Sequence, residues 1–185
     1  MEPHFLFNTL ANVVSLIDAD TPRAKAMLES FTDYLRASLG SLRKVEHTLG
    51  DELALVEAYL RIVQIRMDDR LSYRIDVPDA LRSLTLPSLS LQPLVENAVV
   101  HGLEPTIAGG SVVIEARVAE GGTLNLTVTD DGRGFDTDER STRGSGTALA
   151  NIRERLAQRY GERGTLTIAQ NPPNGVRAAL QLPAR

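Results

Sequence analysis

The chain has 185 residues, and its 20 Lys and Arg against 24 Asp and Glu give a formal net charge of −4. This length fits one domain with an added segment or two small ones, and the acidic balance excludes non-specific attraction to nucleic acid or anionic lipid. Without Cys the chain has no disulfides and no thiolate metal sites. No apolar stretch is long enough to span a bilayer, so we expect a soluble, cytoplasmic piece, and leave open whether a longer parent is membrane-anchored.

Residues 1–67 are predicted to form three helices. The first has one apolar stripe at helical spacing, made of Leu6, Leu10, Val13 and Ile17. A turn at Asp20 leads into the second helix, whose seam consists of Leu28, Phe31, Leu35, Ser38 and Leu42. The third begins at Thr48, which forms a capping box with Asp51, and its heptad seam ends at Met67. A helical hairpin cannot bury its apolar surface alone, so the pattern favours a homodimer with a four-helix bundle.

After residue 67 the spacing of apolar residues changes from helical to alternating, so we place a domain boundary between residues 67 and 71. Alternation predicts a strand at residues 71–77 and hairpins over 112–128 and 166–182. Helical spacing predicts helices at 91–101 and 149–160. We therefore predict an α+β fold, in which a helical hairpin (1–67) is followed by a two-layer α/β sandwich (71–185) with its helices on one face.

Two glycine clusters are candidates for a ligand site. Gly132 and Gly134 follow the strand that ends at Asp130, and Gly144 and Gly146 precede the last helix. A glycine loop before a helix lets backbone N–H groups converge on phosphate oxygens. The second cluster matches neither the dinucleotide fingerprint nor the P-loop, because the required third glycine and the Gly-Lys-Ser/Thr triplet are missing. For one cluster alone, a flexible loop or a helix cap is the favoured interpretation.

A third element is the apolar run of residues 91–98, in which Glu96 and Asn97 stand side by side. The amide oxygen of Asn97 could ligate Mg²⁺, a metal that keeps several waters and bridges substrate phosphates; the alternative is a buried amide that caps a loop. The carboxylate of Asp130 could accept a hydrogen bond from the amine of a purine, or could form an Asx turn.

In this order and spacing, the three elements resemble the N box and the two glycine boxes of the GHKL (Bergerat) ATPase fold, which histidine kinases share with gyrase, MutL and chaperone ATPases. The octapeptide PHFLFNTL at residues 3–10 resembles the phosphoacceptor motif of LytS-type sensor histidine kinases, as do the runs at residues 60–66 and 151–156. The resemblance covers essentially the whole chain.

The resemblance implies a two-component sensor kinase that uses ATP and Mg²⁺. His4 would take the γ-phosphoryl group, and Asn8, one helical turn later, would orient its imidazole or position water. Asn97 would ligate Mg²⁺ and Asp130 would read adenine. Gly132 and Gly134 would form the turn under the base, and Gly144 and Gly146 the phosphate loop. The implied partners are a second copy of the chain and a response regulator, often one of the LytTR type.

Some alternatives remain open from the sequence. Glu96 is a general base, a partner of Asn97 or a helix-surface acid. Val100 and Ala148 depart from the family pattern, which keeps a nucleotide-binding regulatory dimer without kinase activity as a second hypothesis. An ATPase of the gyrase or chaperone type is a third.

Overall fold

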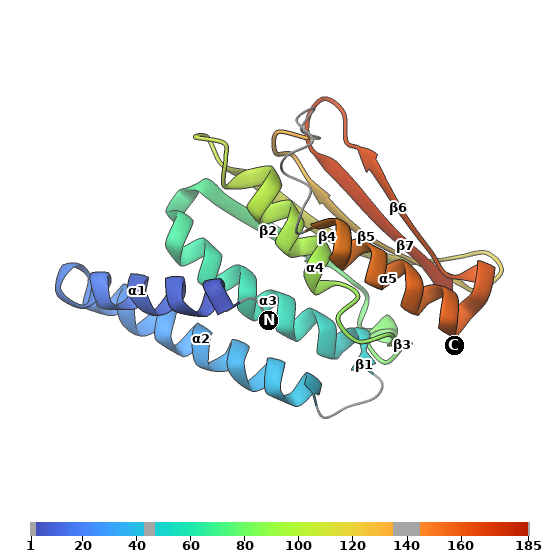
Figure 1. Cartoon of the computed structure of the whole chain (residues 1–185), viewed down its shortest axis with the longest axis horizontal. Helices are drawn as coiled ribbons and strands as arrows, with labels where there is room; N and C mark the ends of the chain where they lie inside the picture. The colour runs from blue at the N-terminus through green and yellow to red at the C-terminus, as the bar shows by residue number, and fades with distance from the viewer. Residues whose placement is uncertain (1–2, 43–46, 135–144, 185) are drawn as a thin grey trace.

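The computed structural model describes residues 3–42, 47–134 and 145–184 (Figure 1). Three long helices come first, namely α1 (Pro3–Ala19), α2 (Thr21–Leu42) and α3 (Leu49–Met67). Helices α1 and α2 form an antiparallel hairpin, and the carboxylate of Asp20 caps the start of α2 by accepting the Arg23 N–H (3.1 Å). Helix α3 packs against α2, and also contacts strand β2 and helix α4. It therefore connects the hairpin to the rest of the chain.

A five-stranded sheet forms the second part, with strand order β2-β4-β5-β7-β6. Its strands are β2 (Leu71–Asp76), β4 (Gly110–Ala119), β5 (Thr123–Asp130), β6 (Thr165–Gln170) and β7 (Val176–Pro183). Strand β2 pairs with β4 in parallel, and the other neighbours are antiparallel. A separate two-stranded pair joins β1 (His47–Thr48) to β3 (Thr85–Leu86).

Helix α4 (Gln92–Asn97), the π-helical turn η3 (Ala98–Leu103) and helix α5 (Ser145–Tyr160) pack together on one face of this sheet (Figure 1). Three short 3₁₀ turns complete the described elements: η1 (Asp68–Arg70), η2 (Asp79–Leu81) and η5 (Gly161–Arg163). The α+β prediction is thus confirmed. Buried side chains from the helices and from the sheet belong to one continuous core. No helix in the described part of the chain is both long and apolar enough to cross a membrane.

The buried faces of α1 and α2 differ from the predicted stripes. In α1, Leu10 and Ile17 of the predicted stripe are 44% and 50% exposed, whereas Val13 of the stripe is buried, as is Thr9, which lies outside it. In α2, Leu28 is 48% exposed. The buried seam of α2 consists of Ala24, Met27, Phe31, Tyr34 and Ser38. Both helices carry apolar residues on two faces, so spacing alone did not decide which face packs against α3.

The predicted helix at residues 91–101 is divided. Helix α4 ends at Asn97, and η3 continues with a wider turn, in which the Glu104 N–H bonds to the Val99 carbonyl (2.9 Å). The last helix begins at Ser145, four residues before the predicted start. Helix α3 begins as predicted, because Thr48 and Asp51 form the reciprocal capping box. Its predicted seam, from Leu49 to Met67, is buried.

Glu52, on the first turn of α3, is fully buried and binds the segment that precedes α4. Its Oε1 accepts the N–H of Leu89 (2.6 Å) and its Oε2 accepts the N–H of Leu91 (2.9 Å). Leu89 has a left-handed backbone (φ 55°), which is unfavourable for a side chain of this kind. Burial raises the pKa of Glu52, and the two backbone N–H groups and the neighbouring His47 oppose this shift. The carboxylate therefore fixes a strained segment where the functional helix begins.

We predict that Glu52→Gln lowers the free energy of unfolding by about 1–3 kcal/mol, because an amide NH₂ then faces a buried N–H that has lost its acceptor. Urea unfolding measures the loss. Glu57→Gln on the same helix is the control. The Glu57 side chain is 40% exposed and pairs with Arg61, so the loss of this ion pair costs only about 0.3–0.5 kcal/mol. Equal stability of the two variants would contradict this role of Glu52.

Candidate functional site

Helix α4 presents Glu96 and Asn97 in its last turn. Pro93 stands in the first turn, where its missing N–H costs no helical hydrogen bond. The Oε1 of Glu96 accepts a hydrogen bond from the Nε2 of Gln92, four residues earlier (2.7 Å). This bond holds the half-buried side chain of Glu96 on the surface of α4 that carries Gln92. The half-buried Asn97 side chain makes no hydrogen bond with the residues that the structure describes, which leaves its amide oxygen available.

Asp130 is the last residue of β5, and its side chain is buried (3% exposed). Its Oδ1 accepts the N–H of Gly132 (3.0 Å), which forms the Asx turn considered as an alternative from the sequence. Burial raises the pKa of this carboxyl, and the N–H groups of Gly132 and Val176 oppose the shift. A buried acid whose Oδ1 is held by a backbone N–H can accept a further hydrogen bond from a ligand donor in a weakly hydrated place.

Glycines from three segments approach Asp130 and the residues beside it. A Cβ on Gly102, in η3, would lie 2.8 Å from the Asp130 Oδ1. A Cβ on Gly132 would overlap the backbone of Gly102, and one on Gly175 would overlap the carbonyl of Asp130. Gly175 also has a positive φ of 103°. The backbone must therefore be bare at all three positions for η3, β5 and the turn before β7 to meet.

Hydrogen bonds from the loop after β5 join the same elements. The N–H of Arg133 donates to the Gly102 carbonyl, and its Nε donates to the His101 carbonyl (both 3.1 Å). The side-chain amide of Asn171 donates to the Asp130 carbonyl (3.0 Å). Gly134 has a left-handed φ of 77° that suits a tight turn. The predicted first glycine box is thus tied directly to the end of the α4–η3 helix.

Part of the predicted phosphate loop lies outside the described residues, namely Gly144. Gly146 is the second residue of α5, so this glycine lies in the first helical turn instead of in a preceding loop. The first-turn N–H groups of a helix have no intrahelical acceptor and can bind an anion. Helix α5 packs directly against α4.

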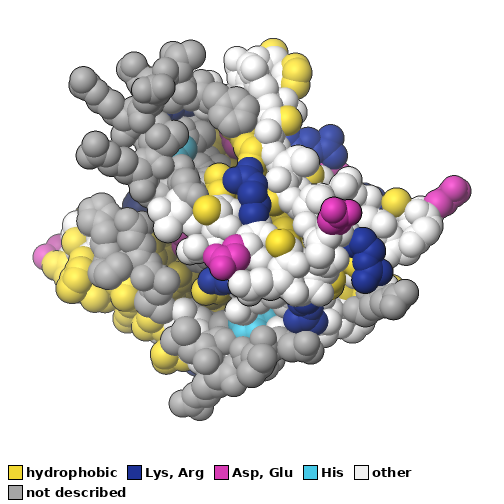
Figure 2. Space-filling model, turned by 45° about the vertical axis from the view of Figure 1, so that its right-hand side comes forward, with side chains coloured by type: hydrophobic (Ala, Val, Ile, Leu, Met, Phe, Trp, Pro, Cys, Tyr) yellow, Lys and Arg dark blue, Asp and Glu magenta, His cyan; other side chains and the backbone are white. Residues whose placement is uncertain are grey.

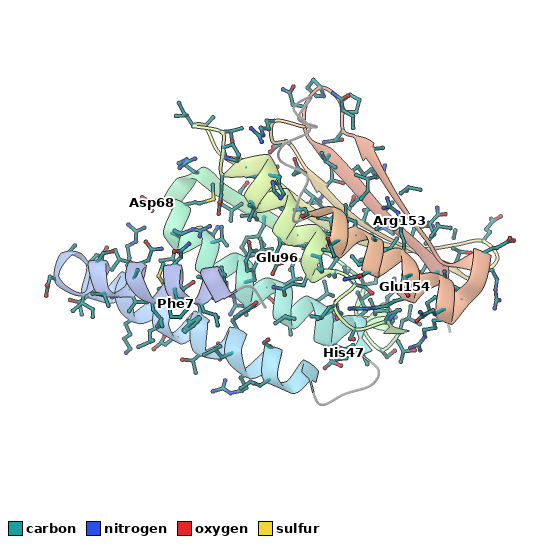
Figure 3. All side chains as sticks on the ribbon, viewed as in Figure 1. Phe7, His47, Asp68, Glu96, Arg153 and Glu154 are labelled. Carbon is teal, nitrogen blue, oxygen red and sulfur yellow. The ribbon has the colours of Figure 1, made fainter. Side chains whose placement is uncertain are left out.

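The backbone of His4 lies in the first turn of α1, and Asn8 follows one helical turn later. Asn8 is half-buried, and its carbonyl accepts a hydrogen bond from the Asn12 side chain (2.9 Å). Figure 3 labels Phe7, on the same helix, and Glu96 on α4. The start of α1 faces the side of the molecule on which α4 lies (Figure 1).

Sequence reasoning missed several residues that build this site. Gly102, Gly175, Gln92 and Glu52 received no role in the sequence analysis. Gly102 and Gly175 approach Asp130, which is 28 and 45 positions away in the sequence. Gln92 bonds to Tyr34, 58 positions away, and Glu52 bonds to Leu89, 37 positions away. The only sequence signal for Gln92 was its position as a polar residue near the start of the largely apolar run at 91–98.

Comparison with known proteins gives two family matches along the chain. Residues 1–71 match the family described as histidine kinase, and residues 87–185 match the histidine kinase-, DNA gyrase B- and HSP90-like ATPases. Sensor histidine kinase YesM of Bacillus subtilis is 35% identical and sensor protein LytS of Oceanobacillus iheyensis 34% identical, each over the whole of this chain. The chain spans about a third of the length of these relatives (32% and 33%).

Solved structures agree with the fold. The kinase domain of a blue-light activated histidine kinase from Erythrobacter litoralis superposes with a TM-score of 0.54 at 16% identity, covering 89% of this chain and 74% of that one. Histidine kinase AdeS of Acinetobacter baumannii gives a TM-score of 0.51 at 15% identity, covering 100% of this chain and 87% of that one.

We predict that Gly132→Ala lowers the free energy of unfolding by about 1–3 kcal/mol, the usual cost of overpacking, since the new methyl group would meet the Gly102 backbone. Thermal or urea unfolding measures it. Gly40→Ala is the matched control, because nothing lies within 4 Å of its Cβ position in α2. That variant gains about 0.5–1 kcal/mol from helix propensity. An unchanged Gly132→Ala variant would show that the approach of η3 to β5 is not tight.

Proposed function

Because this chain belongs to the histidine kinase-, DNA gyrase B- and HSP90-like ATPases and its residues 1–71 match the histidine kinase family, we propose that it is the kinase core of a two-component sensor. It transfers the γ-phosphoryl group of ATP to His4, and from there to an aspartate of a response regulator, for which we propose the LytTR class. The division at residues 67–71 then separates a dimerising phosphoacceptor part from the ATP-binding part. The observation that supports the proposal most is the close packing of η3 against Asp130 and the glycine turn that follows it.

Asp130 is the proposed adenine-binding residue. Its buried carboxylate accepts a hydrogen bond from the adenine amino group, while Gly132 and Gly134 keep the turn beneath the base free of side chains. The triphosphate would then extend toward the first turn of α5. There, backbone N–H groups around Gly144 and Gly146 are the proposed phosphate donors.

The residues present fit a Mg²⁺ ion that is held mainly by substrate and water. Within the described ranges, no group of three or more His, Cys, Asp or Glu could hold a metal by itself. The amide oxygen of Asn97, which has no hydrogen-bond partner among the described residues, is a hard donor that suits a single protein contact to Mg²⁺. When bound, the ion neutralises negative charge on the phosphate oxygens.

His4 is the proposed nucleophile. A lone pair of its neutral imidazole forms the bond to the γ-phosphorus, while the bond from that phosphorus to the bridging oxygen breaks and ADP leaves with the electron pair. The proton on the other ring nitrogen is then released to water or to a base. Asn8 is proposed to orient the ring, and Glu96, held by Gln92, to receive or relay the proton.

A homodimer is proposed from the exposed apolar residues of the hairpin. On α1 these residues form one stripe at helical spacing, Phe7, Leu10, Val14 and Ile17. Leu28 and Leu39 add to it on α2. Hydrophobic side chains gather at the left of Figure 2, on the side where α1 and α2 lie in Figure 1. A second copy would bury this stripe in a four-helix bundle.

Asp130→Asn should abolish the increase in melting temperature that Mg-ATP produces. The NH₂ group of the new amide would face the amino group of adenine, which is itself a hydrogen-bond donor. The apo variant should fold, since a neutral isostere replaces an acid whose pKa burial raises. Differential scanning fluorimetry measures both quantities. Asp131→Asn is the control. Its carboxylate bonds to the Ser111 N–H and hydroxyl (2.6 and 2.7 Å), so apo stability changes but the ATP-dependent shift remains.

Incubation with Mg-ATP should add one phosphoryl group per active chain, detected by intact mass, and His4→Gln should reduce it to background. The label should be lost in acid, as expected of a phosphoramidate. Stabilisation by nucleotide without any label would favour a regulatory nucleotide-binding dimer, and steady phosphate release without label would favour an ATPase.

A further inference from the structure

The start of α1 packs on an aromatic cluster of the same chain. Phe5, which follows His4 directly, has its ring centroid 5.3 Å from that of Tyr34 on α2 and 5.0 Å from that of Tyr59 on α3. The rings of Tyr34 and Tyr59 are 6.4 Å apart and tilted. These separations are typical of favourable aromatic contacts. The phosphoacceptor turn is therefore anchored within its own protomer.

The same cluster is bonded to the ATP-site helix. The Nε2 of Gln92 on α4 donates to the hydroxyl of Tyr34 (3.1 Å) and to the Oε1 of Glu96 (2.7 Å). Gln92 is only 5% exposed, and its Oε1 has no donor among the residues that the structure describes. Buried polar groups of this kind strongly favour one arrangement of their partners. One ring and one amide thus separate the start of α1 from Glu96, the neighbour of Asn97.

The charge of the Glu96 carboxylate also acts on Tyr34 and Tyr59. Burial and then the charge of Glu96 raise the pKa of Tyr34 to about 12. Burial and the same charge raise the pKa of Tyr59 as well. Both phenols lie in the core, where a nearby negative charge is weakly screened. The hydrogen bonds from Gln92 to Tyr34 and to Glu96 place this carboxylate beside the aromatic cluster beneath the start of α1.

We propose that phosphoryl transfer occurs within one protomer, from the ATP bound beside Asn97 to His4 of the same chain. This inference rests on the proposed function and specifies which subunit supplies the phosphoryl group. In this transfer the γ-phosphorus gains the bond to the imidazole nitrogen of His4 and loses its bond to the bridging oxygen, so that ADP leaves. The start of α1 and helix α4 both contact Tyr34 of the same chain, so transfer within the protomer requires displacement of neither helix.

The test uses two differently tagged chains, co-expressed and purified as heterodimers. The first heterodimer joins a His4→Gln chain to an Asp130→Asn chain, so that only transfer between chains gives a label. The second joins a wild-type chain to a chain with both substitutions, so that only transfer within a chain gives a label. Wild-type homodimer, labelled in parallel, reports whether the proposed function itself is present. Asn97→Ala replaces Asp130→Asn if that chain does not fold.

Transfer within a protomer predicts no label in the first heterodimer and a label on the wild-type chain of the second, at about half the amount found per wild-type homodimer. A labelled His4 in the first heterodimer, with the second unlabelled, would overturn the inference but keep the kinase. An unlabelled wild-type homodimer would overturn the proposed function instead. If the chain is monomeric, a labelling rate per chain that does not change on dilution supports transfer within the chain, and a rate that falls in proportion to concentration overturns it.

Discussion

The buried carboxylate of Glu52 is the contact on which the arrangement of this molecule depends most. Placing a charge in the core is unfavourable unless hydrogen bonds compensate, and here the N–H groups of Leu89 and Leu91 do so. These bonds fix the segment directly before α4 onto the first turn of α3. Arg155 of α5 adds a bond to the Ser88 carbonyl (2.7 Å), so α3, α4 and α5 all meet at this short segment. The direction in which α4 points follows from this attachment.

A second constraint is the absence of side chains around Asp130. Gly102, Gly132 and Gly175 allow three backbone segments to approach one buried carboxyl. Hydrogen bonds from Arg133 and Asn171 then close the gap between η3, the loop after β5 and the turn before β7. Together with the attachment at Glu52, these contacts fix the position of Asn97 relative to Asp130. Their relation is therefore set by backbone packing more than by contacts between the two side chains.

Much of the fold could be predicted from the sequence, because local patterns encode it. The change from helical to alternating spacing located the helices and most strands, and the capping box at Thr48 located the start of α3. The contacts that orient the site could not be predicted. Glu52 to Leu89 and Gln92 to Tyr34 join residues 37 and 58 positions apart, and no periodicity records such pairs. The buried face of α1 was also ambiguous, since Leu10 and Val13 are both apolar and only tertiary packing separates them.

Transfer within one protomer requires that a single chain brings its phosphoacceptor helix and its nucleotide site together. A crystal structure with Mg²⁺ and a non-hydrolysable ATP analogue tests it most directly. We expect the adenine amino group to bind the Asp130 carboxylate and the metal to bind the Asn97 amide oxygen. The γ-phosphorus should lie nearer to His4 of the same chain than to His4 of the partner subunit. A nucleotide bound away from Asp130, or a γ-phosphorus within reach of the partner's His4 alone, would contradict it.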